Sequence, residues 1–156
     1  MRTGLLLVVL GLLIFSTATA QVTNEADFKK KFGLLDGYIF DGDYFKALPI
    51  AKELYDYDSS NANIAYMLGT SYLGASPDRK KAIYYLEQAI MLSPPSPMYK
   101  ESDYKEKTAP GIAYYNLAKA YHFTYRFDDA ISNYYNYRSF VDLEDVSTYG
   151  EVKKKI

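Results

Sequence analysis

Apolar residues recur every three to four positions along several stretches of this chain. The clearest stretch runs from Asn63 to Leu73, where the apolar side chains fall on one face of a helix. Ser76-Pro77-Asp78 interrupts the pattern, and the same spacing resumes from Ala82 to Ile90. Because only a short break separates the two stretches, the pattern predicts two antiparallel helices, that is, a helical hairpin.

Two further hairpins are predicted on either side of this one. Upstream, the helical spacing covers 28–39 and 47–55; downstream, it covers 112–123 and 130–137. No stretch alternates apolar and polar residues in the manner of a strand bounded by hairpin turns. The chain is therefore predicted to be all-α, with about three helical hairpins.

One proline lies inside a predicted helix. Pro49 lacks the amide donor of a helical residue, and its ring crowds the carbonyl group of Phe45. We therefore expect this helix to kink or to restart near Leu48.

The three hairpins form a repeat of about 34 residues. The middle unit carries small and large residues in a characteristic order: Leu68, Gly69, Tyr72, Ala82, Leu86, Ala89 and Pro94. This pattern resembles the tetratricopeptide repeat (TPR) family, which implies a TPR-like superhelix, an α-solenoid, with units at about 28–61, 62–95 and 111–144. At Gly69 the small residue lets the paired helix approach closely, so a leucine at this position is expected to overpack the hairpin.

An insertion at 96–110 separates the second unit from the third. Its neighbourhood contains four of the six prolines, which favours a loop or a short helix on the surface. Two interpretations stay open: a plain spacer, or a loop that presents Tyr99 and Tyr104 to a partner.

The N-terminus has the features of a secretory signal peptide at 1–20. Arg2 is followed by an apolar run from Leu5 to Phe15, and Ala18-Thr19-Ala20 supplies small residues for cleavage. The apolar run is shorter than the roughly 20 residues of a membrane-spanning helix, and no later stretch is longer. We expect an exported protein without a membrane span after signal cleavage, with a TPR-like domain at 21–156 and the start of a further helix at 147–156.

Composition and charge exclude several kinds of protein. The chain has 18 Lys and Arg against 19 Asp and Glu, so it lacks the basic excess of a nucleic-acid-binding protein. It has no cysteine, which excludes disulfides, thiolate metal sites, cysteine nucleophiles and a lipoprotein anchor. Nor does any motif indicate catalysis: there is one histidine, His122, and neither a nucleophile elbow nor a phosphate-binding loop. We therefore expect no enzymatic activity, no cofactor and no metal.

A second resemblance is narrower. It rests on Asn61-Ala62-Asn63, on the run from Tyr104 to Pro110, and on Ala120-Tyr121-His122. These segments are similar to the N-terminal repeat region of exported OmpA-like proteins of Bacteroidota. Such proteins usually continue into a β-propeller and a peptidoglycan-binding domain at the outer membrane, and some are linked to type IX secretion and gliding. The chain is expected to be either an N-terminal piece of such a protein or a short stand-alone paralogue.

The TPR resemblance also implies which residues line the inner groove of the solenoid. The fifth positions of the first helices are aromatic, and their neighbours are mixed in character, so the candidate groove residues are Phe32, Asp36, Tyr66, Thr70, Tyr115, Lys119 and His122. By contrast, Tyr72 and Tyr121 are expected to pack between hairpins. The carboxylate clamp of some TPR proteins needs Lys and Asn where this chain has Phe32 and Asp36, so that mode of binding is not expected.

These observations predict a periplasmic scaffold or adaptor that binds a partner protein in its groove, in an outer-membrane or secretion-related assembly. The alternative is the N-terminal fragment of an OmpA-like protein, in which peptidoglycan is bound only by a missing C-terminal domain. A carbohydrate-uptake lipoprotein of the SusD type is disfavoured because the required cysteine is missing.

Overall fold

A computed structural model of the chain describes residues 21–141, which contain helices and no strand. The six helices are α1 (Glu25–Phe40), α2 (Tyr44–Tyr57), α3 (Ala62–Ala75), α4 (Arg79–Leu92), α5 (Ile112–Phe123) and α6 (Phe127–Arg138). The predicted all-α fold and its six helical stretches are confirmed. The signal peptide, the third unit's last residues and the expected helix at 147–156 lie outside the described residues. In the described part, none of the helices has the length and apolarity that crossing a membrane requires.

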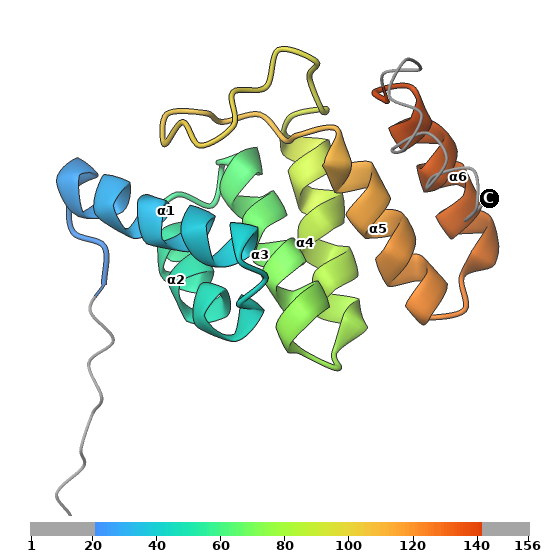
Figure 1. Cartoon of the computed structure of the whole chain (residues 1–156), viewed down its shortest axis with the longest axis horizontal. Coiled ribbons are helices and arrows are strands. Elements are labelled where there is room, and N and C mark those ends of the chain that lie inside the picture. The colour runs from blue at the N-terminus through green and yellow to red at the C-terminus, as the bar shows by residue number, and fades with distance from the viewer. Residues whose placement is uncertain (1–20, 142–156) are drawn as a thin grey trace, which may run out of the picture.

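The helices pack as three successive hairpins. Each helix contacts the next one along the chain, and α3 also contacts both α1 and α5. The second helices meet through side chains, since the rings of Tyr55 in α2 and Tyr85 in α4 have centroids 5.2 Å apart. The first helices of the hairpins thus form an inner layer, and the second helices form an outer one. Figure 1 shows the hairpins side by side, from α1 and α2 at one end to α5 and α6 at the other. This is the packing of a helical-repeat bundle.

Side chains just before the first residue determine where several helices begin. Asn24 accepts a hydrogen bond from the Asp27 amide at 3.0 Å, and Asn61 accepts one from the Ile64 amide at 3.2 Å. Between α1 and α2, Gly42 adopts φ of +73°, which a glycine tolerates without strain, so the turn is tight. Polar and glycine residues therefore set the hairpin geometry.

Pro49 does not divide its helix. α2 is continuous from Tyr44 to Tyr57, so the predicted restart near Leu48 is wrong. Phe45 and Pro49 are both exposed, which lets water satisfy the carbonyl group that loses its donor. On the opposite side, Ala47 and Ala51 are fully buried and keep both halves of the helix on the core.

The core is centred on α3, the most buried helix, and Gly69 is a point of close approach between α3 and α4. A Cβ atom at Gly69 would lie 2.7 Å from Leu86 Cγ and 2.9 Å from the Leu86 amide nitrogen. Tyr72 and Tyr121 are 6% and 5% exposed, as predicted. Tyr72 stacks on Tyr85 with ring centroids 5.4 Å apart, and the Tyr121 hydroxyl donates to Glu87. Tyr121 therefore lies between the second and third hairpins, whereas Tyr72 stacks within its own hairpin.

Candidate functional site: an inner cavity walled by the insertion

A cavity of about 740 Å³ lies on the side of the inner layer. Its walls come from the end of α1, the middle of α3, the insertion, the start of α5 and the end of α6 together with Phe140. We refer to it as the inner cavity.

The insertion forms one wall of this cavity because its side chains attach it to the inner layer. The Tyr99 hydroxyl donates to Asn63 Oδ1 at 3.0 Å, and the Ser102 hydroxyl donates to Asp36 Oδ2 at 2.7 Å. Further along, the Tyr104 hydroxyl lies 3.2 Å from a Glu25 carboxylate oxygen, and it too donates. In Figure 1 the insertion leaves α4, reaches back over α3 toward α1 and returns to α5.

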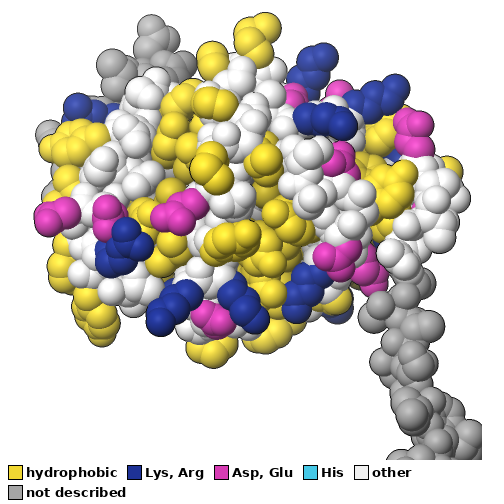
Figure 2. Space-filling model, turned by 180° about the vertical axis from the view of Figure 1, so that it is seen from behind, with side chains coloured by type: hydrophobic (Ala, Val, Ile, Leu, Met, Phe, Trp, Pro, Cys, Tyr) yellow, Lys and Arg dark blue, Asp and Glu magenta, His cyan; other side chains and the backbone are white. Residues whose placement is uncertain are grey.

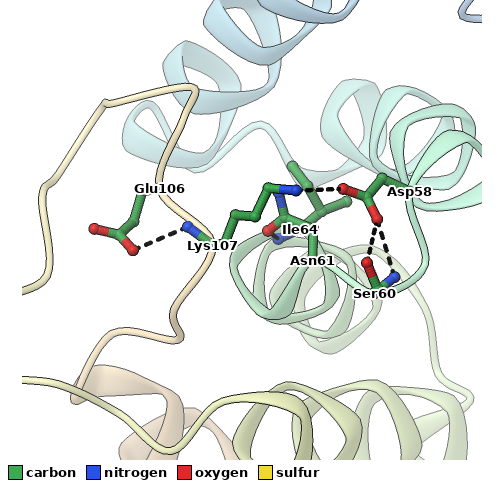
Figure 3. A network of polar contacts seen from close by, with 6 residues as sticks. All are labelled: Asp58, Ser60, Asn61, Ile64, Glu106 and Lys107. Carbon is green, nitrogen blue, oxygen red and sulfur yellow. Dashed lines mark hydrogen bonds and ion pairs between the residues drawn. The ribbon is translucent and has the colours of Figure 1, made fainter.

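Polar contacts also anchor the insertion at its return to α5 (Figure 3). Lys107 Nζ lies 3.4 Å from Asp58 Oδ2, and the Lys107 carbonyl accepts the Ala62 amide at 3.1 Å. Burial opposes ionisation of Asp58, but hydrogen bonds from Ser60 and the charge of Lys107 outweigh it and lower the pKa of Asp58. The anchor therefore depends on a charged carboxylate at the α2–α3 turn.

Glu106 holds the bend of the insertion itself. Its carboxylate accepts the amides of Lys100 and Lys107, and it also accepts the amide and hydroxyl of Thr108 at 2.8 and 2.7 Å. Burial raises the pKa of Glu106, and these hydrogen bonds more than compensate, so its net pKa is lowered. Glu106 thus joins residues 100, 107 and 108 of the insertion through one ionised side chain.

The two tyrosines of the insertion lie in different surroundings. The ring of Tyr104 is turned toward α1, with Lys29 Nζ 5.1 Å from its centroid. The ring of Tyr99 lines the inner cavity while its hydroxyl is bonded to Asn63. Of the two tyrosines of the insertion, therefore, only Tyr99 lines the inner cavity.

Asp36 and Tyr66, two of the predicted groove residues, line the inner cavity. Asp36 is partly exposed beside Ser102. Tyr66 lies deeper, and burial raises its pKa to about 12 although a hydrogen bond with Thr70 acts in the opposite direction.

Thr70 and Lys119 line a second, smaller cavity of about 220 Å³, next to Gly74 and Phe123. In it the Asn116 amide donates to the Thr70 hydroxyl at 3.0 Å, which joins α3 to α5 in the buried interior. The structure therefore distributes the predicted residues over two hollows instead of one groove.

The remaining three predicted residues line neither cavity. Phe32 is 3% exposed and stacks near Phe28, so its expected exposure in the groove is wrong. Tyr115 packs against Tyr134 and Tyr137 of α6, with centroid distances of 5.8 and 5.2 Å. His122 is exposed, and its ring stands perpendicular to that of Phe127. The three aromatic residues at the fifth positions of the first helices, Phe32, Tyr66 and Tyr115, consequently do not form a continuous surface.

Several residues of the inner cavity were not among the predicted ones. Glu101 and Ser102 come from the insertion, and Tyr137 and Phe140 come from α6 and the residues after it. Repeat positions do not identify them, because these residues lie outside the first helices. Within residues 21–141 no three His, Cys, Asp or Glu side chains are grouped in a way that would hold a metal ion.

Comparison with known proteins adds no relative to this description. No model of a known protein family matches the chain, and no curated protein matches it. On the face seen in Figure 2, hydrophobic, basic and acidic side chains are intermixed, and no single kind forms a separate patch. The inner cavity is therefore the strongest candidate site.

Proposed function

We propose that this protein is an exported, periplasmic scaffold with a TPR-like superhelix, and that it binds a segment of a partner protein in the inner cavity. The observation that carries the proposal is the cavity, which is lined by the inner layer and the insertion. Apolar side chains are left uncovered at its edge: Phe40 is 89% exposed and Ile112 is 41% exposed. Hollows that combine apolar and polar walls are the usual binding sites for peptide segments.

The cellular setting rests on the sequence. The signal-like segment at 1–20 supports export, and the similarity to the repeat region of OmpA-like proteins supports a place in an outer-membrane or secretion-related assembly. The same similarity favours the second candidate, in which these repeats are the partner-binding part of a longer, peptidoglycan-binding protein. Both candidates use the inner cavity in the same way.

Site-specific crosslinking in the source cells tests the proposal. A photoreactive phenylalanine analogue replaces Ile112 at the cavity, and in a control it replaces Met91, which is 70% exposed and lines neither cavity. We expect a defined adduct in the envelope fraction from position 112 and none from position 91. Equal adducts from both positions, or none from position 112, would contradict binding in the cavity.

Tyr66 and Tyr115 are unsuitable for this test, although their positions in the repeat suggest them. Both are largely packed against neighbouring side chains, so replacing them would disturb the fold as well as the surface.

A further inference from the structure

The inner cavity has a charge of one sign. Asp36, Asp41 and Glu101 line it, and no Lys, Arg or His of residues 21–141 does so. These charges act on the wall itself: burial and the neighbouring Tyr66 raise the pKa of Tyr99, and the carboxylates of Asp36, Glu106 and Glu101 raise it further. The cavity therefore has a negative potential, despite the nearly balanced charge of the whole chain.

The end of α1 strengthens this potential. The last turn of a helix carries partial negative charge and is normally stabilised by basic side chains. The last turn of α1 has none, and Asp41 occupies its C-cap. Lys46 of α2 interacts with Asp41 only at long range, because its Nζ lies 2.5 Å from Asp43. This helix end thus has acidic side chains where a cation is favoured.

Apart from two serines of the insertion, Ser96 and Ser102, and two glycines, the rest of the lining is apolar or aromatic. Ile112 and Phe140 lie opposite the acidic end, together with the ring of Tyr137. An extended segment suits this lining, since its alternate side chains point to opposite walls.

We propose that the occupant is an extended segment of a partner protein in which a Lys or Arg adjoins an apolar residue. This inference rests on the proposed function and specifies its ligand. The cation lies between Asp36 and Glu101 near the end of α1, close to the rings of Tyr66 and Tyr99. The apolar neighbour contacts Ile112 and Phe140.

Selection of random peptides displayed on phage tests this inference on the immobilised full chain. The same selection is run on the double variant Asp36→Asn/Glu101→Gln, which removes two charges but leaves an oxygen at position 36 to accept the Ser102 hydroxyl. It is also run on Ile112→Lys, which obstructs the cavity. We expect peptides with adjoining basic and apolar residues from the unmodified chain, and loss of the basic preference with the double variant.

The affinity of one selected peptide for each variant measures how much the two carboxylates contribute to binding. The double variant should bind it about tenfold more weakly at low salt, because each partly exposed carboxylate contributes a factor of about three. Raising the salt concentration should weaken binding to the unmodified chain more than binding to the double variant.

The experiment distinguishes failure of the proposed ligand from failure of the proposed function. Selected peptides that depend on Ile112 but lack basic residues would overturn this inference and leave the proposed function standing. An absence of peptides that depend on Ile112 would refute the proposed function as well. If basic peptides bind only after Lys153, Lys154 and Lys155 are changed to Glu, the chain's own lysines occupy the cavity, and the assignment to a partner falls.

Discussion

The substitution Gly69→Ala in α3 tests the close packing of α3 against α4. The added methyl group would lie 2.7 Å from Leu86 Cγ and 2.9 Å from the Leu86 amide nitrogen. A side-chain carbon could move away by a change of rotamer, but the amide nitrogen is part of α4. The substitution therefore requires α3 and α4 to separate by several tenths of an ångström.

Two opposing effects determine how much Gly69→Ala changes the free energy of unfolding. Overpacking of a buried contact costs about 1–3 kcal/mol, and the replacement of a glycine by alanine inside a helix stabilises by about 0.8–1 kcal/mol. The net effect is a loss of about 1 kcal/mol, which corresponds to a decrease in Tm of a few degrees for a domain of this size. A leucine at the same position adds more volume, and its cost should be larger.

Gly33→Ala is the matched control. Gly33 also lies inside a helix, α1, but a Cβ atom there would meet nothing within 4 Å. The gain from helix propensity is shared by both substitutions, so Gly33→Ala should raise the free energy of unfolding by about 0.5–1 kcal/mol. Urea unfolding followed by circular dichroism measures both variants. A Gly69→Ala variant as stable as Gly33→Ala would refute the close contact between α3 and α4.

Three further predictions concern polar groups. Thr70→Val leaves the Asn116 amide without its buried acceptor and should lower the free energy of unfolding by about 1–3 kcal/mol in urea titrations; unchanged stability would contradict the hydrogen bond. The lowered pKa values of Asp58 and Glu106 contribute stability that is present at neutral pH and is lost as the pH falls below their ordinary values of 3.8 and 4.5. Tm should therefore decrease in acid. The decrease in Tm should be smaller in a variant carrying both Asp58→Asn and Glu106→Gln. The raised pKa of Tyr66, about 12, acts in the opposite pH range: its contribution to stability is complete below pH 10 and is lost as the pH rises further. Ultraviolet titration should show delayed tyrosinate formation by several buried tyrosines, and Tyr66→Phe should reduce the delayed signal by one tyrosine.

The helices were predictable because their signals are local. Each of the six has apolar residues at helical spacing, and polar, glycine or proline residues interrupt the pattern between the helices. Pro49 shows the limit of such reasoning. Its effect depends on which side of α2 faces solvent, and the burial of Ala47 and Ala51 decides this through contacts with other helices.

Prediction of the site was less complete, since a repeat position has meaning only relative to its neighbours. Tyr66 lies between two flanking hairpins and lines the cavity, as its position indicates. Phe32 has the corresponding position in the first unit, yet its ring lies beside Phe28, which itself contacts Tyr57 of α2. Equal positions in a repeat therefore do not imply equal exposure.

The insertion explains why the composition of the cavity could not be read from repeat positions. Its prolines indicate a loop, but its location depends on hydrogen bonds such as Ser102 to Asp36 and Tyr104 to Glu25, which join distant parts of the chain. Those contacts carry Glu101 to the cavity lined by Asp36, whereas a groove built from first helices alone would lack that second charge. The ligand preference proposed for the cavity therefore comes from the insertion as much as from the repeats, and a relative with the repeats but without this loop should not share it.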